Sequence, residues 1–540
     1  MKGLRWRVGS IAVQRVAKDV MTQLDIVRDV TAPFGAGKNF SANASLVAGL
    51  IPSSVNVALS VSAAHGYSDV PGLLRWLDKY PYGCIEQTVS RAMPLLYFND
   101  LAALAGLPTD KALHQRIQDA VDSVLDMQNY VGDFGMWGPG SSADSWLSVF
   151  ALDFLERAKA KGYVVANEPL SRGLKWLGET AASSGNDDDT RAYAFYVLAR
   201  AGRANLSDLR YYSDTRGHRW TTAIAAALTG AAAAEAGDRS RAAFAFNRAR
   251  EIVLSAKPTL YPTADYGSLV RDLAATTALA IEGGDPQIVP ALMAKTSALD
   301  MRLNATTTQD KAWMLLAAYA LSSQHTRLSV LVDGRPVQPI AGAVHLSPTL
   351  GMLSKGVTLT NTSDATVWRT VSVQGTPAEP LPGVADGVVL TKTFWSLEGQ
   401  PVDFSSLTQN QRVVVVLQGR MADNLYRQMA LLDLLPAGLE IESPIAGDEA
   451  KLYPWLGEVT ATSLEDARDD RFVAAFFIGS QYRPAKPTTP EPRPEFRVAY
   501  IVRAVTPGQF VLPAGVAEDM YAPAVIGRTG MGKLVIAPQK

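Results

Sequence analysis

The stretch YPYGCIEQT at residues 80–88 is the most informative part of the 540-residue sequence. It stands where a long helical region begins, and Gly83 before its cysteine permits a tight turn. Glu86 falls in the first turn of the predicted helix, where a carboxylate suits the helix dipole. A helix N-terminus favours the thiolate form of a cysteine, so Cys84 is predicted to be a good nucleophile.

The spacing of Cys84 and Gln87 allows one specific reaction. Residues three apart lie on the same face of a helix, so the thiolate can attack the carboxamide carbon of Gln87, expel ammonia and close a thiolactone. The product is an internal acyl donor that reacts with amines, hydroxyls and water. The fold must therefore hide it until it is needed, and the aromatic rings of Tyr80 and Tyr82 are the nearest candidates to cover it.

Composition excludes several classes of site and partner. Cys84 is the only cysteine, which rules out an intramolecular disulfide and a multi-thiolate metal site. The 51 basic and 52 acidic residues nearly cancel, so no overall field attracts a nucleic acid. The sequence contains no HExxH or GxxxxGK[ST] motif, so we expect neither a metal nor a cofactor. No run of about 18 apolar residues predicts a membrane span, and residues 1–20 lack the apolar core of a signal peptide.

Hydrophobic patterning divides the chain into a β-like start, a helical middle and a β-rich end. Residues 24–30 and 55–62 have the patterns of strands. From about residue 71 to residue 323 apolar residues recur with a period of 3.6, which predicts eleven or twelve helices. No fixed short repeat appears in the letters, so a closed ring of helical hairpins is favoured over an open solenoid.

Strand patterns return after residue 325. Phe496, Val498 and Tyr500 alternate with their neighbours, which predicts a strand buried on one face. The proline-rich residues 482–494 are predicted to form a surface loop, and the prolines between residues 375 and 383 to mark a boundary. The further strands predicted in this region are 328–332, 357–361, 367–373, 388–394 and 412–417.

Other interpretations of these residues were weighed. A cysteine peptidase or transglutaminase needs a histidine base, and none of the five histidines stands in a recognisable peptidase context. Glu86 either serves only as a first-turn charge or takes part in the reaction, and Tyr80 is equally compatible with core packing. Asp187–Asp189 resembles the acidic clusters of toroidal terpene cyclases, but a helix N-cap is the favoured interpretation.

Residues 83–87, Gly-Cys-Ile-Glu-Gln, resemble the Gly-Cys-x-Glu-Gln thioester motif of alpha-2-macroglobulins and complement thioester proteins. The flanking YPYG and the PLLY at 94–97 are similar to the bacterial branch, whereas Ile85 departs from the glycine usual in the animal proteins. The resemblance extends over nearly the whole chain. Further similar stretches are 133–135, 192–202, 265–272, 308–312, 433–438, 468–471, 505–508 and 519–521.

The resemblance implies a multidomain α and β fold. An α/α-toroid thioester domain is expected to interrupt a CUB-type β-sandwich, and a macroglobulin-like β-sandwich is expected to follow. The implied ranges are 1–70 for the first part of the CUB-type sandwich, 71–325 for the toroid, 326–380 for the second part, and 381–540 for the C-terminal sandwich.

The resemblance also implies an endopeptidase inhibitor rather than an enzyme. In this family a protease cuts a bait region, the thioester is exposed, and a lysine of the protease is acylated and trapped. Met520 and Tyr521 are candidates to cover the bond from the last domain, because a thioether and an aromatic ring make a dry lid. The alternative is a non-covalent binding module on the same fold with a vestigial or unformed thioester.

The family also implies a location and a larger protein. Its bacterial members are periplasmic and often tethered to the inner membrane. Bait-bearing domains precede the part that this chain resembles. We therefore expect either that Met1 is not the natural start or that the chain is a C-terminal fragment.

Overall fold

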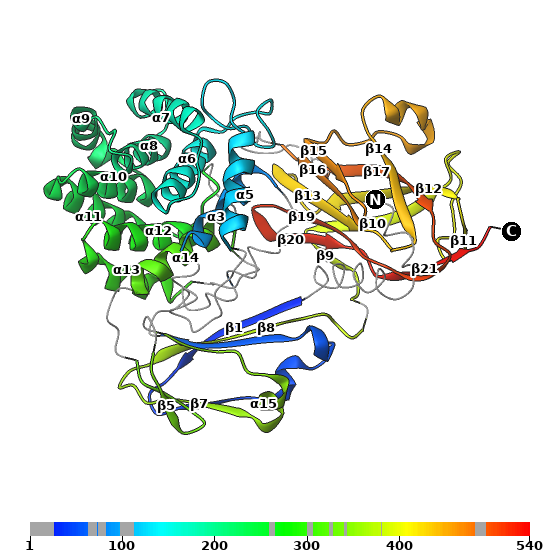
Figure 1. Ribbon diagram of the computed structural model, residues 1–540, viewed down its shortest axis with the longest axis horizontal. Coiled ribbons are helices and arrows are strands. Elements are labelled where there is room, and N and C mark those ends of the chain that lie inside the picture. The colour runs from blue at the N-terminus through cyan, green and yellow to red at the C-terminus, as the bar shows by residue number, and fades with distance from the viewer. Residues whose placement is uncertain are drawn as a thin grey trace, which may run out of the picture. The chain divides into compact units, whose positions relative to one another are not determined.

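The computed structural model describes residues 26–62, 73, 83–97, 113–258, 265–299, 306–322, 328–339, 343–379, 381–480 and 493–539. The chain divides into two compact units. One comprises residues 28–48 and 56–373, and the other comprises residues 374–540 with 49–55 and 1–27. Figure 1 shows a helical part and separate β-sheet parts. No helix among the described residues is long and apolar enough to cross a membrane.

Among the described residues of the first unit, six inner helices form a closed ring. Each inner helix contacts the next inner helix along the chain. The last inner helix contacts the first, which closes the ring. The predicted closed ring of helices is therefore confirmed. The inner helices are α3 (Ile85–Leu95), α6 (Ser145–Ala160), α8 (Asp188–Arg200), α10 (Ala223–Glu235), α12 (Leu269–Glu282) and α14 (Thr308–Ser322).

Outer helices alternate with the inner ones along the chain. The two sets differ in sequence because inner helices are surrounded by protein and outer helices keep one solvated face. The alanine-rich α10 is buried almost all round, whereas α7 buries a stripe that includes Leu170, Leu174 and Leu177. The outer helices are α5 (Leu113–Asp126), α7 (Asn167–Ala182), α9 (Leu206–Arg216), α11 (Arg239–Ser255) and α13 (Val289–Thr296).

A β-sandwich in the same unit takes strands from both sides of the helical ring. Its two four-stranded sheets have the orders β1-β8-β3-β6 and β2-β7-β4-β5. In the first sheet Val61 lies opposite Val344, and in the second Phe40 lies opposite Leu359. The ring is thus an insertion within a split sandwich. The strands are β1 (Ile26–Phe34), β2 (Asn39–Ala42), β3 (Asn56–Ser62), β4 (Val330–Val332), β5 (Arg335–Val337), β6 (Ala343–Leu346), β7 (Val357–Asn361) and β8 (Val367–Gly375), and the short helix α15 (Leu350–Lys355) precedes β7.

The described residues of the second unit form three sheets, with the orders β10-β12-β17-β14, β15-β16-β13-β19-β20-β9 and β11-β21-β18. The first two share an apolar core that includes Val415, Leu431 and Phe476. The strands are β9 (Val384–Asp386), β10 (Val388–Trp395), β11 (Leu407–Thr408), β12 (Arg412–Met421), β13 (Arg427–Leu434), β14 (Leu439–Ile445), β15 (Leu464–Ala467), β16 (Arg471–Ile478), β17 (Glu495–Ala504), β18 (Gly508–Leu512), β19 (Gly515–Asp519), β20 (Ala522–Arg528) and β21 (Gly532–Ala537).

The predicted one-sided burial of residues 496–501 is wrong. Phe496 and Tyr500 face the main core, but Ala499 and Ile501 are also buried, in a second apolar cluster on the other face of β17. The segment after β14, including Leu456, supplies part of that cluster. A strand covered on both faces loses the alternation that marks a half-exposed one.

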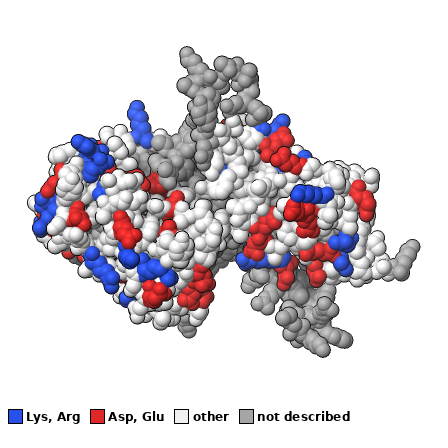
Figure 2. All heavy atoms as spheres, turned by 90° about the horizontal axis from the view of Figure 1, so that it is seen from above, with Lys and Arg blue, Asp and Glu red and all other residues white. Residues whose placement is uncertain are grey.

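Charges on the surface are mixed. On the face drawn in Figure 2, acidic and basic side chains are interspersed over the described parts of the chain. This agrees with the formal net charge of −1. Of the predicted proline-rich loop, residues 482–492 lie outside the described residues.

Candidate functional site

Helix α3 begins where the sequence predicts. Cys84 is its N-cap residue, with extended backbone angles (φ −68°, ψ 161°), and its carbonyl accepts the first helical hydrogen bond from the Thr88 N–H at 2.9 Å. The Ile85 N–H donates to the carbonyl of Met136 at 2.9 Å, which ties the helix start to the loop before α6. The Cys84 side chain is fully buried. The predicted nucleophile therefore lies at a helix N-terminus and is shielded from solvent.

Gln87 lies three residues further on, and it is also fully buried. Neither its Oε1 nor its Nε2 has a hydrogen-bond partner. An unsatisfied buried polar atom costs about 1–3 kcal/mol, so a whole carboxamide without partners is an unusual arrangement for a purely structural glutamine. The packing keeps water away from its carbon.

Glu86 bridges two helices. Its carboxylate accepts hydrogen bonds from the hydroxyl of Ser90 at 2.8 Å, one turn along α3, and from the hydroxyl of Thr308 in the first turn of α14 at 2.7 and 2.8 Å. Burial raises the pKa of Glu86 to about 7, with Asp310 nearby also raising it, and the two hydroxyl donors oppose the shift. Glu86 is thus more than a first-turn charge, because it joins the first and last inner helices.

The first turn of α14 is fixed by its own polar contacts. The Thr307 N–H donates to Asp310 at 2.8 Å, and the Asp310 N–H donates to the Thr307 hydroxyl at 3.1 Å, which is a reciprocal cap. The ammonium of Lys311 is buried and donates to the carbonyls of Thr306 and Thr307. These bonds hold Thr308 in place opposite Glu86.

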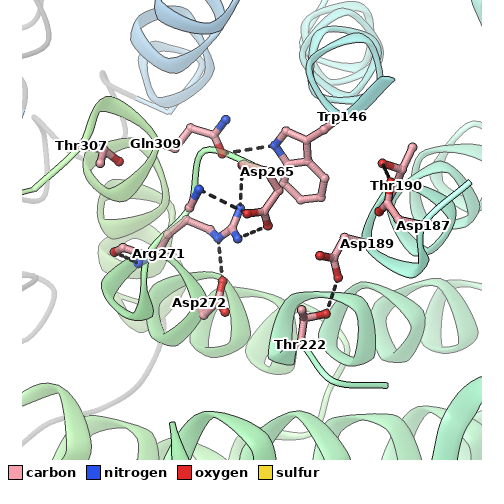
Figure 3. Close-up of polar contacts among 12 residues, drawn as sticks. Trp146, Asp187, Asp189, Thr190, Thr222, Asp265, Arg271, Asp272, Thr307 and Gln309 are labelled. Atoms are coloured by element: carbon pink, nitrogen blue, oxygen red, sulfur yellow. Dashed lines mark hydrogen bonds and ion pairs between the residues drawn. The ribbon is translucent and has the colours of Figure 1, made fainter. Parts of the chain in front are cut away.

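A polar cluster surrounds Arg271 at the start of α12 (Figure 3). Its guanidinium donates to Asp265 and, at 2.7 Å, to Asp272, and it lies 5.1 Å above the ring of Trp146. The Trp146 indole N–H in turn donates to Oε1 of Gln309 at 3.4 Å. Residues from the first turns of α6, α12 and α14 therefore meet here, as expected of inner helices whose N-terminal ends gather at one end of the ring.

The N-cap interpretation of Asp187–Asp189 is confirmed. Asp187 caps α8 by accepting from the Thr190 N–H at 2.8 Å, and Asp188 pairs with Arg216 at 2.7 Å. Asp189 accepts a hydrogen bond from the Thr222 hydroxyl at the neighbouring helix start, and burial raises the pKa of its carboxyl to about 7. Within the described part of the chain, no group of three or more His, Cys, Asp or Glu side chains is arranged to hold a metal ion.

The tight turn at Gly83 stays a prediction. Its backbone lies outside the left-handed region, and a Cβ at this position would meet no atom within 4 Å. Tyr80 and Tyr82, the candidate aromatic covers, lie outside the described residues.

Met520 and Tyr521 belong to the other unit, where they form the turn between β19 and β20. Both side chains are buried although they occupy the tip of a hairpin. Asp519 holds this turn by accepting from the Tyr521 N–H at 2.9 Å, and Arg427 pairs with Asp519 at 2.8 Å.

Comparison with known proteins finds two matching domain families. A profile of the bacterial alpha-2-macroglobulin MG10 domain matches residues 387–524, and a profile of the A-macroglobulin TED domain matches residues 58–202. Curated relatives include the alpha-2-macroglobulins of Xylella fastidiosa, 28% identical over 89% of this chain, and of Escherichia coli K12, 29% identical over 83% of it. The matched region spans only 30% and 28% of those proteins' lengths.

Solved structures agree with this fold. Escherichia coli alpha-2-macroglobulin from domain MG7 to the C-terminus covers 95% of this chain at 22% identity, with a TM-score of 0.80, and 82% of that chain is matched. Salmonella alpha-2-macroglobulin reacted with methylamine covers 95% at 25% identity, with a TM-score of 0.79, and 34% of that chain is matched. The predicted fold class, a helical domain with flanking β-sandwich domains, is confirmed.

Proposed function

The chain belongs to the bacterial alpha-2-macroglobulin family, and from this premise we propose that it acts as an endopeptidase inhibitor that traps proteases through a thioester between Cys84 and Gln87. The observation that carries the proposal is the buried Gln87 carboxamide, which lacks a hydrogen-bond partner and follows a buried helix-capping cysteine by three residues. Conversion to a thioester replaces two orphaned N–H donors with sulfur, which needs no hydrogen bond, and so relieves part of the burial penalty.

The reaction balances with this chain's own groups. Sγ of Cys84 bonds to the carboxamide carbon of Gln87, the C–N bond breaks, and the thiol proton leaves with the nitrogen as ammonia. An amine of a captured protease later attacks the same carbon, the C–S bond breaks, and the proton lost by the amine returns to the sulfur. Each molecule reacts once, so the protein is an inhibitor and has no turnover.

Several wider features are part of the same proposal. The attacking amine would come from a lysine of the protease, after cleavage of a bait region in other domains of a longer protein. A periplasmic location with tethering to the inner membrane suits a trap for incoming proteases. The Salmonella relative reacted with methylamine supports a small amine as the laboratory substitute for lysine. The CUB-type assignment of the split sandwich and the ranges 1–70, 71–325, 326–380 and 381–540 belong to this proposal too.

The proposal is tested by the intact mass of freshly purified protein under denaturing, thiol-free conditions, with and without methylamine. We expect a mass short by one ammonia before treatment. After treatment we expect a methylamine adduct on Gln87 and a newly titratable thiol on Cys84. Cys84→Ala is the matched control, because it retains Gln87 and cannot form the bond.

The opposite result separates the two candidate functions. A full mass with a free thiol, an unmodified Gln87 in the peptide map and no methylamine uptake would favour the non-covalent binding module. A glutamate in place of Gln87 would instead reveal a thioester that formed and was hydrolysed.

A further inference from the structure

We propose that the backbone carbonyl of Met136 is a positioning group for thioester formation, because it fixes the peptide unit that joins Cys84 to the rest of α3. This inference rests on the proposed function. It assigns a role in the reaction to a loop outside the thioester motif, residues 134–143 between α5 and α6. We call this loop the Met136 hairpin.

The start of α3 lacks a side-chain cap. The first N–H groups of a helix have no partner within the helix, and a serine, threonine, aspartate or asparagine usually accepts from them. Cys84 occupies this N-cap position, and its side chain makes no capping hydrogen bond. A capping side chain at residue 84 could not also supply the sulfur of a thioester. An acceptor for the first turn of α3 must therefore come from elsewhere in the chain.

Met136 supplies this acceptor. The Ile85 N–H, at the first position of the helix, donates to the carbonyl of Met136 at 2.9 Å. At the other end of the same peptide unit, the Cys84 carbonyl accepts from the Thr88 N–H, also at 2.9 Å. A planar peptide unit bonded at both ends cannot rotate without breaking one of these bonds. The two bonds therefore hold Cys84 in its extended conformation, which sets the direction of its side chain.

The Met136 hairpin is itself tied to the helices on either side of it. The Gly135 N–H donates to the carbonyl of Met127, directly after α5, at 3.1 Å. The Phe134 N–H donates to the hydroxyl of Ser148 on α6 at 2.9 Å. These bonds hold the carbonyl that accepts from α3 in place.

A close approach inside the hairpin requires glycine at residue 135. A Cβ there would clash with the carbonyl oxygen of Gly138 and would lie 2.6 Å from Oγ of Ser141. The backbone next to Met136 would have to move to relieve these contacts. At Gly138 a Cβ would meet no atom within 4 Å, and the backbone lies outside the left-handed region. The two glycines therefore offer a matched pair of substitutions.

A fixed Cys84 favours closure of the thioester ring. Sγ of Cys84 bonds to the carboxamide carbon of Gln87, the C–N bond breaks, and the thiol proton leaves with the nitrogen as ammonia. The ring includes the backbone from residue 84 to residue 87, and the helix already fixes its later part. Holding the N-cap residue in advance reduces the entropy lost on closure. Opening of the bond by an amine has no such requirement, because it separates the two side chains.

The test measures thioester formation in the full chain made by cell-free synthesis. Samples are denatured at intervals with an alkylating reagent, which labels the single cysteine only while it is a free thiol. Ile85→Pro replaces the N–H with a ring carbon that displaces the Met136 carbonyl, and proline suits both the first helical position and an extended residue before it. Ile85→Val is the control, because it keeps the N–H and its side chain has as many carbons as that of proline.

We expect Ile85→Pro to slow thioester formation by about threefold to tenfold, the factor that corresponds to one net hydrogen bond, and Ile85→Val to match wild type. Gly135→Ala should slow formation in the same way, and Gly138→Ala should not. Methylamine uptake by the thioester that does form should not slow in any of these variants. A defect in packing alone would lower the temperature of thermal unfolding without separating formation from uptake.

Thermal unfolding identifies the folded variants, and Gly135→Ala tests the same carbonyl from the hairpin side if Ile85→Pro does not fold. A folded Ile85→Pro or Gly135→Ala that forms the thioester as fast as its control would overturn the inference and leave the proposed function intact. A folded wild type whose Cys84 stays open to the label and whose Gln87 remains unmodified would overturn the proposed function together with this inference.

Discussion

Glu86 gives the protein a pH dependence that can be measured at one residue. Burial raises its pKa from 4.5 to about 7. Between these values the folded chain holds a proton that the unfolded chain has lost, so stability falls as pH rises through this window. Glu86→Gln still accepts a hydrogen bond from Thr308 but does not titrate. In urea unfolding from pH 4.5 to 7.5, we expect wild type to lose about 3 kcal/mol of stability that the variant retains.

Asp189 is the control for this experiment. Burial also raises its pKa from 3.8 to about 7, so Asp189→Asn should remove a separate part of the same slope. The double variant should show the flattest stability profile. An unchanged slope in Glu86→Gln would show that Glu86 is ionised in the folded protein throughout this pH range.

At the scale of secondary-structure elements, the Glu86–Thr308 bridge joins α3 to α14. Thr308→Val removes the hydroxyl that contacts both oxygens of the Glu86 carboxylate. That hydroxyl also lowers the pKa of Glu86. We expect this variant to lose about 1–3 kcal/mol at pH 8, where the carboxylate is charged and then lacks that donor. Thermal or urea unfolding measures the loss, and thioester formation should fall with it.

Thr308→Ser is the matched variant, because it keeps the hydroxyl and removes only a methyl group. It should stay close to wild type in both measurements at pH 8. Equal stability of Thr308→Val and Thr308→Ser at that pH would show that the bridge does not hold the two helices together.

Local sequence patterns predicted the helix starts and strands whose signals lie within a few neighbouring residues. The start of α3 at Cys84 and the strand at 357–361 agree with the sequence, because caps and half-buried alternation are local signals. The Glu86–Thr308 bond joins residues 222 positions apart, and nothing in either neighbourhood marks the other. Such a contact exists only after the ring has closed.

At the scale of the whole molecule, the second unit contains a buried ion pair between its two main sheets. Lys392 on β10 pairs with Asp433 on β13 at 2.7 Å, and the Tyr500 hydroxyl on β17 donates to the same carboxylate at 2.7 Å. We expect Lys392→Met to cost about 3–5 kcal/mol in urea unfolding, because it leaves Asp433 charged and buried.

Removal of both charges should be less harmful than removal of one. Lys392→Met with Asp433→Leu should recover most of the lost stability, since no buried charge is left uncompensated. A double variant as unstable as the single one would show that the pair contributes net stability and is not merely tolerated.

Tyr80 and Met520 remain predicted covers of the thioester. Tyr80→Gly and Met520→Ala should each increase the rates of hydrolysis and methylamine uptake, on the order of tenfold if the cover adds about 1.4 kcal/mol to the barrier. Intact mass followed over time gives both rates. Tyr211→Ala is the control, because that aromatic ring is exposed on α9. Unchanged rates in Tyr80→Gly or Met520→Ala would remove that residue as a cover.

Because the ring closes between its first and last inner helices, it can be completed only after the last of them has been synthesised. A ribosome that adds about 5–20 residues per second needs about 10 to 45 seconds to travel the 222 residues from Glu86 to Thr308. During that interval Gln87 has been synthesised, but α14, the last inner helix of the ring, has not. Under the proposed function, we therefore expect the nascent chain to carry a free cysteine and an unmodified glutamine, and to form the thioester only once α14 has completed the ring.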